Sequence, residues 1–316
     1  MKIISTELYS SERKVAWDDF VDKSINAPFF FKRDFMEYHA DRFTDFSVIL
    51  SERSRIAGVI PASIVQDSSI VVSHQGLTFG GMAIDKDMTT PLFLKCFESF
   101  LVFLRREGIC KLIYKAIPHF YHQYPAAEEY YAAFKFGGKL IGRDVGSVMT
   151  PQSNCGVQKR RARMINKARS NNITFSESDD LDAYWHILSE VLLHKHGAKP
   201  VHSLDEIKYL STIFPGNIRL FASFQNDIMV SGVLVFESKY VAHCQYIASS
   251  ATAREVGALD LVFDCLINEI YKDKKVFSFG KSTEKDGSIL NEGLITQKEG
   301  FGARATIFDT YEFTLA

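Results

Sequence analysis

The stretch that decides the fold runs from Arg219 to Ser282 and reads RLFASFQNDIMVSGVLVFESKYVAHCQYIASSATAREVGALDLVFDCLINEIYKDKKVFSFGKS. Three apolar runs come first, and short polar segments at residues 225–227 and 238–239 separate them. Residues 259–271 then carry apolar side chains at helical spacing, and KVFSFGKS follows as another short apolar run. Short strands bounded by turn residues, then an amphipathic helix and a strand, predict a β-β-β-α-β unit.

The same order occurs earlier in the chain, between residues 46 and 118. The matched features are Gly58 with Gly232, His74 with His243, and the expected helix Phe93–Arg106 with the expected helix Leu259–Tyr271. The offset of about 170 residues is longer than the roughly 20–50 residues of a solenoid repeat. The repeat therefore predicts two domains of similar fold, with one copy much altered.

Length and composition agree with two domains. The chain has 316 residues, of which 46% are hydrophobic, enough for two buried cores. The segment GRDVGSVMTPQSN at residues 142–154 is rich in Gly and Ser and places a boundary near residue 150. We therefore expect an α+β protein with domains at 1–150 and 151–316, each built on a mixed, mostly antiparallel sheet flanked by helices.

Charge and cysteine usage narrow the class of protein. The formal net charge of −1 gives no general attraction to nucleic acid or to an anionic membrane. The five cysteines are scattered without a C-x-x-C pair, which predicts neither a disulfide framework nor a zinc site. The first residues lack the apolar segment of a signal peptide, and no window approaches the roughly 18 apolar residues of a membrane span. We expect a soluble cytoplasmic protein without a metal, and its oligomeric state stays open.

Further helices are expected from apolar spacing and capping residues. They are Ser11–Ser24 with Ser11 as N-cap, residues 29–43, Ala126–Phe136, residues 158–170 and residues 181–196. The fourth of these is the most basic segment of the chain, with Lys159, Arg160, Arg161, Arg163, Lys167 and Arg169. Such a helix is either a solvated surface or an anion site for the phosphates of a nucleotide, of CoA or of RNA, and the pattern leaves both open.

A glycine pattern lies at the start of the last expected helix. Arg254–Gly257 supplies the first four positions of the phosphate-binding pattern Q/R-x-x-G-x-G/A, but Leu259 stands where the sixth residue should be small. In this pattern, backbone N–H groups at a helix N-terminus hold phosphate oxygens, and glycine allows their close approach. The sequence also contains no G-x-S-x-G, Walker A or dinucleotide-binding pattern.

Two groups of histidines are candidates for a site. His243 lies in the middle of an expected strand, where alternation places Gln245 and Ile247 on its side and Cys244 and Tyr246 on the other. A lone histidine in a strand is either structural or a candidate general base. His119, Tyr121 and His122 form a second group, which lacks a carboxylate or cysteine at metal-ligand spacing and is therefore more typical of substrate hydrogen bonding.

Four segments carry a resemblance to a known family. They are IYKAIPHFYHQYPAAEEYYAAF at 113–134, QYIASS at 245–250, VFSFGKS at 276–282 and LNEGLITQKEGFGARA at 290–305. The F-G-x-S pattern from Phe279 to Ser282, followed by G-L-x-x-x-K-x-x-F-G from Gly293 to Gly302, is similar to the signature of the Fem peptidyltransferases. Over nearly its whole length, the chain resembles the tandem-GNAT, Fem-like N-acyltransferases of bacterial surface-polysaccharide gene clusters.

The resemblance implies transfer of an acyl group, acetyl or 3-hydroxybutanoyl, from acyl-CoA to the amine of a nucleotide-linked amino sugar. The relatives act on dTDP-3-amino-3,6-dideoxyhexoses for O-antigen or capsule biosynthesis. The implied catalytic residues are His243 as general base and Tyr246 as proton donor to the departing thiolate. The implied coenzyme A contacts are Gln245, Ile247, Ala248, Ser249, Ser250, Arg254, Gly257 and Ser282. The implied sugar-nucleotide contacts are His74, Lys115, His119, Tyr121, His122, Asn291 and Lys298.

Two other functions stay open at this stage. One is a Fem-type transferase that uses aminoacyl-tRNA, which the basic segment favours and the near-zero net charge disfavours. The other is a non-catalytic protein that binds an acyl-CoA or a sugar, which the imperfect glycine pattern favours. If the enzymatic assignment is right, Lys298→Ala is expected to lower activity far more than stability.

Overall fold

The computed structural model describes residues 4–153 and 155–315, and these form two compact units. Unit 1 contains the chain up to Val145 together with Thr283–Ile289 and the residues from Ile307 onward. Unit 2 contains Gly146–Ser282 and Leu290–Thr306. The expected division into residues 1–150 and 151–316 therefore does not describe the two units fully, because the chain returns to unit 1 twice after leaving it.

Unit 1 contains two groups of strands and the helices that cover them. Its elements are β1 (Ile4–Leu8), η1 (Ser11–Arg13), α1 (Lys14–Lys23), η2 (Phe29–Phe31), α2 (Arg33–Glu37), β2 (Thr44–Asp45), β3 (Val48–Glu52), β4 (Arg55–Ile60), β5 (Ser63–Ile64), β6 (Ile70–Val72), β7 (Ala83–Ile84), α3 (Thr90–Arg106), β8 (Lys111–Lys115), η3 (His119–Tyr121), α4 (Glu128–Lys135), β15 (Thr283–Glu284) and most of β9 (Lys139–Met149) and β17 (Arg304–Thr314). One sheet has the order β1-β3-β4-β7, and the other strands follow the order β17-β8-β6-β5-β2.

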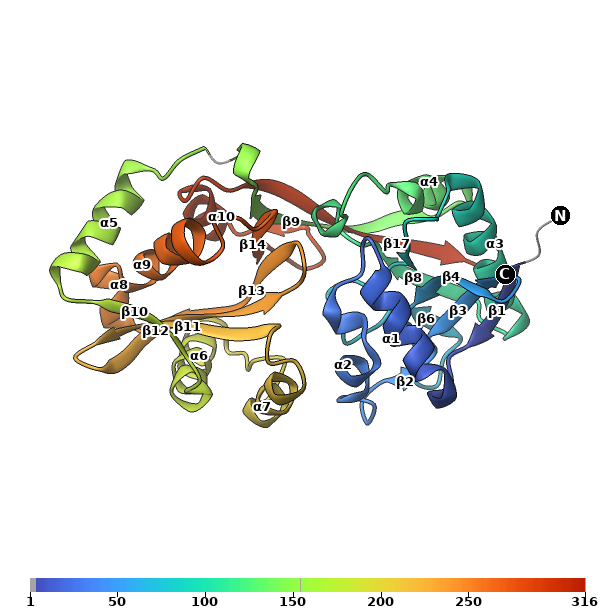
Figure 1. Cartoon of the computed structure of the whole chain (residues 1–316), viewed down its shortest axis with the longest axis horizontal. Coiled ribbons are helices and arrows are strands. Elements are labelled where there is room, and N and C mark those ends of the chain that lie inside the picture. Colours follow the sequence, from blue (N-terminus) through green and yellow to red (C-terminus); the bar gives the residue numbers. More distant parts are fainter. Residues whose placement is uncertain (1–3, 154, 316) are drawn as a thin grey trace. The chain divides into compact units, whose positions relative to one another are not determined.

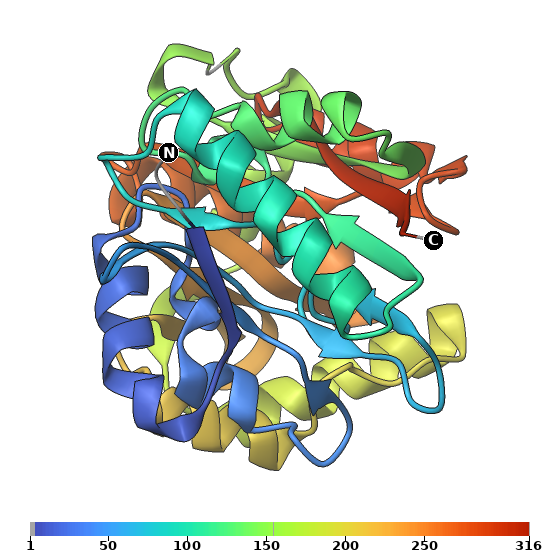
Figure 2. The same ribbon diagram turned by 90° about the vertical axis from the view of Figure 1, so that its right-hand side faces the viewer.

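The long helix α3 shows how sequence spacing builds the core of unit 1. Its buried residues recur every three or four positions and are Phe93, Cys96, Phe97, Phe100, Leu101 and Leu104. These side chains pack into one cluster with residues of β3, β4, β8 and β17. Figure 2 shows α3 in teal crossing the strands on one side, with the blue helices α1 and α2 on the other. Unit 1 is thus a mixed sheet structure flanked by helices.

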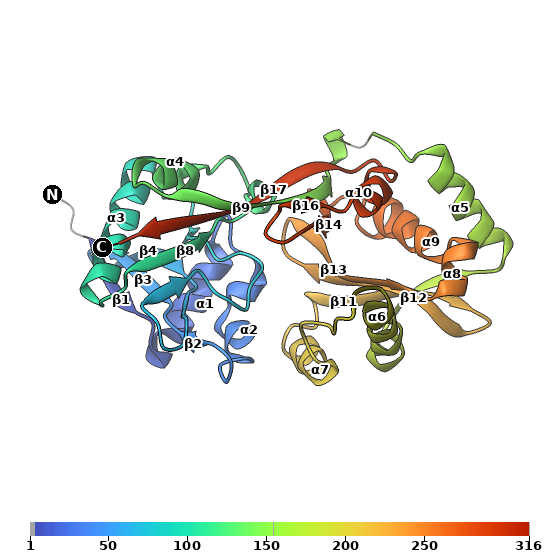
Figure 3. The same ribbon diagram turned by 180° about the vertical axis from the view of Figure 1, so that it is seen from behind.

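Unit 2 is the more regular copy. Its elements are η4 (Pro151–Ser153), α5 (Lys159–Ser170), β10 (Thr174–Ser178), α6 (Leu181–His196), α7 (Leu204–Ile213), β11 (Ile218–Gln225), β12 (Ile228–Glu237), β13 (Val241–Ser249), α8 (Ala251–Val256), α9 (Ala258–Cys265), the π-helical turn η5 (Leu266–Ile270), β14 (Val276–Lys281), β16 (Ile289–Leu290, at its boundary) and α10 (Glu292–Glu299). The strand order is β10-β11-β12-β13-β14-β9. Figures 1 and 3 show α5, α8 and α9 on one face of this sheet and α6 and α7 on the other.

The expected repeat is present in the topology of the two units. In unit 1, the chain passes from β6 through α3 to β8, and β8 pairs with β6 in parallel. In unit 2, it passes from β13 through α9 to β14, and β14 pairs with β13 in parallel. Gly58 and Gly232 both lie in the second strand of a hairpin, and a side chain on either would collide with Met82 or Tyr184. The predicted match of His74 to His243 is wrong, because His74 follows β6 in a left-handed turn at φ 49° whereas His243 lies within β13.

Three of the expected helices are shorter in the structure. The helix expected at 11–24 begins at Lys14, because Ser11 belongs to a separate 3₁₀ turn whose N-cap is Ser10. The helix expected at 29–43 is interrupted, because Lys32 takes an extended conformation at φ −67° and ψ 149° between η2 and α2. The helix expected at 126–136 is α4. No helix in the described parts of the chain is both long and apolar enough to cross a membrane.

Candidate active site

The two parallel strands of unit 2 separate in the middle of its sheet. Backbone pairing of β13 with β14 runs from Val241 opposite Val276 to His243 opposite Ser278. Beyond this point β14 shifts its register toward β9, with Gly280 at φ 73°, while β13 continues to Ser249 beside β12 alone among the described residues. The edge of β13 that faces away from β12 therefore offers backbone N–H and C=O groups to an extended ligand.

His243 stands where the two strands separate. Its imidazole Nδ1 lies 3.1 Å from the Ser278 hydroxyl, and the ring is 9% exposed. Burial, together with the positive charges of Lys298 and Lys281, lowers the pKa of His243 to about 4. The imidazole is therefore neutral at pH 7, so it has a nitrogen lone pair that can accept a proton. A Cβ on Gly280 would lie 3.8 Å from Nε2, in ordinary van der Waals contact, so it is the φ of 73° that favours glycine here.

Lys298 holds the separated end of β14 in place. Its ammonium donates hydrogen bonds of 3.1 Å to the Gly280 carbonyl, 2.6 Å to the Lys281 carbonyl and 2.9 Å to the Ser282 hydroxyl. The side chain is buried, and this burial lowers the pKa of Lys298 to about 8. All three ammonium donors are used within the chain. Lys298 and Ser282 thus fix the shape of β14 next to His243, which differs from the direct ligand contacts expected for them.

A β-bulge changes the face on which Tyr246 lies. The pairing between β12 and β13 shifts at Gln245, so that Tyr246 is opposite Leu234 whereas Cys244 is opposite Val235. Tyr246 therefore shares the α6 face of the sheet with His243. Its hydroxyl lies 2.7 Å from His202 Nδ1, and its ring packs edge-on against Trp185. The predicted alternation was wrong here, because the extra residue of a bulge reverses the order of faces. Burial raises the pKa of Tyr246.

The remaining residues predicted to contact coenzyme A follow the bulge. Gln245 and Ile247 are half-buried, Ala248 and Ser249 are buried, and Ser250 caps α8 by accepting a hydrogen bond from the Ala253 N–H. Arg254 lies in α8 and donates two hydrogen bonds, of 3.2 and 3.0 Å, to the Ser249 carbonyl. The segment is therefore a short helix whose arginine is turned back onto the end of β13.

The glycine of the phosphate-binding pattern is covered by another helix. Gly257 ends α8 and begins α9 with φ 79°, and a Cβ on it would lie 2.3 Å from the Met164 carbonyl of α5. The first residues of α9 are buried, and the Asp260 carboxylate in its first turn bonds to Arg161 at 2.7 Å. Coenzyme A fits this chain in part: the edge of β13 suits its pantetheine arm, whereas the N-terminus of α9 has no room for its pyrophosphate.

Unit 1 brings three of the predicted sugar contacts into one short turn. His119, Tyr121 and His122 lie in or directly after η3, and the His119 ring stacks on Tyr130 at 4.5 Å between centroids. Only His119 of these three is exposed, since Tyr121 and His122 are 5% and 3% exposed. Partial burial of its ring lowers the pKa of His119. The turn therefore presents one imidazole at the surface and uses the other two side chains in its core.

The other predicted sugar contacts make hydrogen bonds within the chain. The Lys115 ammonium donates to the Leu77 carbonyl, and His74 Nδ1 accepts from the Gly76 N–H at 3.2 Å. Burial lowers the pKa of His74 to about 3. Asn291, in unit 2, caps α10 by accepting a hydrogen bond of 3.0 Å from the Leu294 N–H. These contacts position loops and a helix end.

Two residues near these groups were missed at the sequence level. Ser278 is the hydrogen-bond partner of His243, and its place before the F-G-x-S pattern gave no separate signal. Glu129 is 3% exposed, accepts hydrogen bonds from Tyr114 at 3.0 Å and from the Ile117 N–H at 3.1 Å, and lies 3.9 Å from His122. Burial raises the pKa of Glu129 to about 8. In the sequence, Glu129 is one of two adjacent glutamates in EEYY, and nothing there indicates that it is buried.

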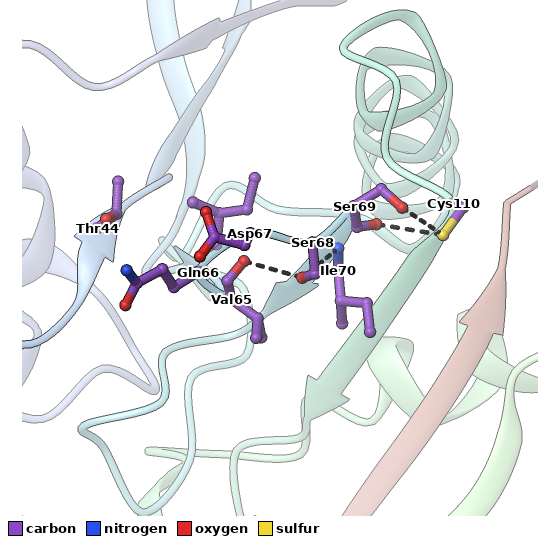
Figure 4. A pocket seen from close by; sticks show the side chains of 9 residues that line it. Thr44, Val65, Gln66, Asp67, Ser68, Ser69, Ile70 and Cys110 are labelled. Carbon is purple, nitrogen blue, oxygen red and sulfur yellow. Dashed lines mark hydrogen bonds between the residues drawn. The ribbon is translucent and has the colours of Figure 1, made fainter.

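A shallow depression of about 740 Å³ lies elsewhere in unit 1, at the turn between β5 and β6. Figure 4 shows its lining, in which the Ser69 hydroxyl lies 2.8 Å from the exposed Cys110 sulfur. None of the predicted site residues belongs to this lining. In the described parts of the chain, no group of three or more His, Cys, Asp and Glu side chains could hold a metal ion.

Solved structures of other proteins share this fold. FemX matches with a TM-score of 0.67 at 11% identity, over 96% of this chain and 96% of that one. L-PGS from Bacillus licheniformis matches with a TM-score of 0.62 at 13% identity, over 98% and 92%. A tandem GNAT protein from the clavulanic acid biosynthesis pathway matches with a TM-score of 0.51 at 9% identity, over 99% of both chains.

At these identities the likeness establishes the fold. The chain has the tandem GNAT, Fem-like fold, and the expected α+β class is confirmed. No protein-family model matches the sequence, and no curated protein matches it either.

Proposed function

We propose that this chain is an N-acyltransferase, which moves an acyl group from a thioester such as acyl-CoA to the amine of a nucleotide-linked amino sugar. The observation that carries the proposal is the separation of β13 from β14 beside the buried, neutral His243. An extended thioester arm can add to the edge of β13 as an extra strand would. That placement brings its carbonyl to the residues around the bulge at Gln245.

In this proposal the strand edge binds and polarises the thioester. Backbone N–H groups of β13 donate to the carbonyl oxygen, and they stabilise the negative charge that develops when the amine attacks. The bulge at Gln245 leaves one residue of β13 outside the regular ladder, and its N–H is the proposed donor. Because these donors belong to a sheet, they need no rearrangement during the reaction.

His243 is the proposed proton acceptor. The amine nitrogen becomes cationic, and therefore strongly acidic, once it has attacked the carbonyl. A weak base such as His243, with a pKa of about 4, can then remove its proton. The Ser278 hydroxyl at Nδ1 holds the ring in place. Tyr246 shares the α6 face of the sheet with His243, and its hydroxyl, which lies 2.7 Å from His202 Nδ1, is the proposed proton donor to the departing thiolate.

The exposed His119 of unit 1 is the proposed contact for the amino-sugar nucleotide among the residues of η3. Its imidazole stacks on Tyr130 and keeps one face for a ligand. The buried His122 packs edge-on against this ring, at 5.9 Å between centroids. Acetyl and 3-hydroxybutanoyl are the acyl groups, and dTDP-linked amino-deoxy sugars the acceptors, to test first.

Mass spectrometry of the purified protein with short-chain acyl thioesters and dTDP- and UDP-amino sugars tests the proposal. We expect one new mass that equals a sugar nucleotide plus one acyl group. His243→Gln should lower kcat by roughly 100-fold, the usual contribution of a general base. His186→Gln, which removes an exposed imidazole from α6, is the matched control. No product from any pair, with a folded protein, would overturn the proposal.

A further inference from the structure

The N-terminus of α9, where the glycine pattern predicts the binding of the donor's phosphates, is covered by α5. Gly257 and the first turn of α9 are buried, and the Met164 carbonyl of α5 lies where a phosphate oxygen would approach the glycine. The Asp260 carboxylate fills the positive end of the helix from within, and Arg161 neutralises it. A pyrophosphate would meet both a carbonyl oxygen and a carboxylate there.

The helix that covers this site, α5, has one face packed against α9 and one face exposed to solvent. Arg161 and Arg169 point toward α9 and form ion pairs with Asp260 and Asp264, at 2.7 and 2.6 Å. Ile165 and Ala168 are buried on the same side. Two ion pairs and two apolar side chains therefore attach α5 firmly to unit 2.

The other face of α5 is an exposed basic stripe, which we define as Lys159, Arg160, Arg163 and Lys167. Lys159, Arg163 and Lys167 are spaced by four residues, so they follow one another along one face over roughly 12 Å. No carboxylate of the described residues forms an ion pair with these three. The helix itself contains no Asp or Glu, which leaves the stripe as a strong local positive charge.

The stripe lies at the end of unit 2 to which the free edge of β13 leads. β13 ends at Ser249, and the chain passes through Ser250 directly into α8, which packs against α5. Figures 1 and 3 show α5 and α8 together at this end of the unit. A thioester arm on β13 that runs from Gln245 past Ser249 therefore leaves the protein near α5.

We propose that the acyl group arrives on the phosphopantetheine arm of an acidic carrier protein, which docks on the basic stripe of α5. This inference rests on the proposed acyl transfer and names its donor. The arm of a carrier protein is the same as that of CoA but ends in a protein, so it needs no pyrophosphate site. Four cations on one helix complement the acidic helix of such a carrier, and they steer its approach.

The reaction balances with this donor. The sugar amine attacks the thioester carbonyl carbon, a C–N bond forms, and the C–S bond breaks. The products are the sugar amide and the free thiol of the carrier, and the proton that the nitrogen loses ends on the sulfur. RNA suits the stripe less well, because α5 carries no aromatic side chain on which a base could stack, and the net charge of the chain is −1.

The test compares three donors that carry the same 3-hydroxybutanoyl group: a bacterial acyl carrier protein, CoA and pantetheine. We expect kcat/KM to be at least about 10-fold higher with the carrier protein than with CoA at low salt, and the advantage to shrink as salt screens the charges. We expect CoA and pantetheine to agree within about threefold, because no site for the pyrophosphate is open, whereas one charge-assisted phosphate site adds roughly 10-fold or more.

The triple variant Lys159→Glu, Arg163→Glu and Lys167→Glu isolates the stripe. It should lose at least about 10-fold in kcat/KM with the carrier protein, through KM, and keep its rate with pantetheine. The matched control reverses three other exposed lysines of unit 2, namely Lys199, Lys239 and Lys272. It should leave both rates unchanged. Thermal unfolding of both variants checks that they fold.

Equal use of CoA and carrier protein, or a stripe variant that keeps the full rate with the carrier, would overturn the carrier and leave the acyl transfer standing. The same holds if CoA exceeds pantetheine by 100-fold or more, since that requires an open pyrophosphate site. Failure of all three donors would overturn the acyl transfer as well. RNA binding that the stripe variant abolishes, without any thioester activity, would assign the stripe to RNA.

Discussion

His243 links the proposed chemistry to a measurable pH dependence. Its pKa in the folded chain is about 4, below the usual 6.5, because the ring is buried near Lys298 and Lys281. Between these two pH values the unfolded chain binds a proton that the folded chain does not. The free energy of unfolding therefore falls as the pH is lowered from about 6.5 toward 4.

We expect His243→Gln to flatten this fall. Urea denaturation at several pH values between 7.5 and 4.5 gives the slope of the unfolding free energy against pH for each protein. His74, whose pKa is lowered to about 3, contributes in the same direction and remains in the variant, so the slope should shrink without vanishing. His186→Gln is the control. Identical slopes for wild type and His243→Gln would show that folding does not lower the pKa of His243.

Lys298 is expected to matter for stability as well as for activity. Lys298→Met keeps an unbranched side chain, one atom shorter than lysine, and removes the three hydrogen bonds to Gly280, Lys281 and Ser282. Leaving their oxygens buried without a donor should cost about 3 kcal/mol of unfolding free energy. This differs from the expectation from sequence that activity would fall far more than stability.

The measurement is chemical denaturation beside the acyl-transfer assay. Lys272→Met, which changes an exposed lysine of the same unit, is the control and should shift stability by less than about 0.5 kcal/mol. A Lys298→Met protein with unchanged stability and no activity would restore the direct ligand contact first expected for this residue.

At the scale of elements, α5 packs so closely on the start of α9 that adding one methyl group there should destabilise the protein. Gly257→Ala forces a side chain into the left-handed region and into the Met164 carbonyl 2.3 Å away. We expect a loss of about 2–4 kcal/mol in unfolding free energy. The unfolding midpoint in urea measures it.

Gly197→Ala separates the two causes. Gly197 also ends a helix with a positive φ, 58°, but a Cβ on it would meet nothing within 4 Å. It should cost about 1–2 kcal/mol, for backbone strain alone. Equal losses at the two glycines would mean that α5 does not press on Gly257.

Elements with a strong local pattern could be predicted from the sequence. α3 is an example, because its phenylalanines recur at helical spacing and a threonine caps its start. The bulge at Gln245 could not, since a bulge arises from the pairing of two strands and leaves no residue signature of its own. Its one extra residue moved Tyr246 to the other face.

The candidate site was predictable only as a region. His243 and Lys298 are both in it, but 55 residues apart in the chain. Their closeness in space depends on the turn at Gly280, where Lys298 binds the backbone. In the sequence this turn appears only as one glycine of the F-G-x-S pattern. The glycine pattern at Gly257 misled for a similar reason. Glycine there allows another helix to approach, and the same permissiveness would suit a phosphate.

At the scale of the whole chain, unit 1 depends on residues far from it in sequence. Phe313 is 1% exposed and packs in the core of unit 1 with Phe97 and Tyr114, and β17 pairs there with β8. Phe313→Ala should therefore cost about 3–5 kcal/mol in the stability of unit 1. Hydrogen exchange should show faster opening of β8 and α3, with β12 unaffected.

Phe134→Ala is the matched control for this change. Phe134 lies on α4 of the same unit and is 82% exposed, so its removal should alter stability by less than about 0.5 kcal/mol. Faster exchange in unit 2 rather than unit 1 would contradict the placement of the last strand. The sequence predicted two domains, but not that the last strand belongs to unit 1. The sequence pattern of a strand predicts that it is a strand, and it does not indicate which sheet the strand joins.

The route of β17 has a consequence for how the protein is made. A ribosome releases residues 1–145 first, yet residues 307–315 of the same unit emerge only after the roughly 160 residues between them, most of which belong to unit 2. At about 5–20 residues per second, unit 1 waits roughly 8–30 s for its last strand. During that time the edge of β8 is unpaired on one side. The nascent chain at this stage is a natural client for a chaperone.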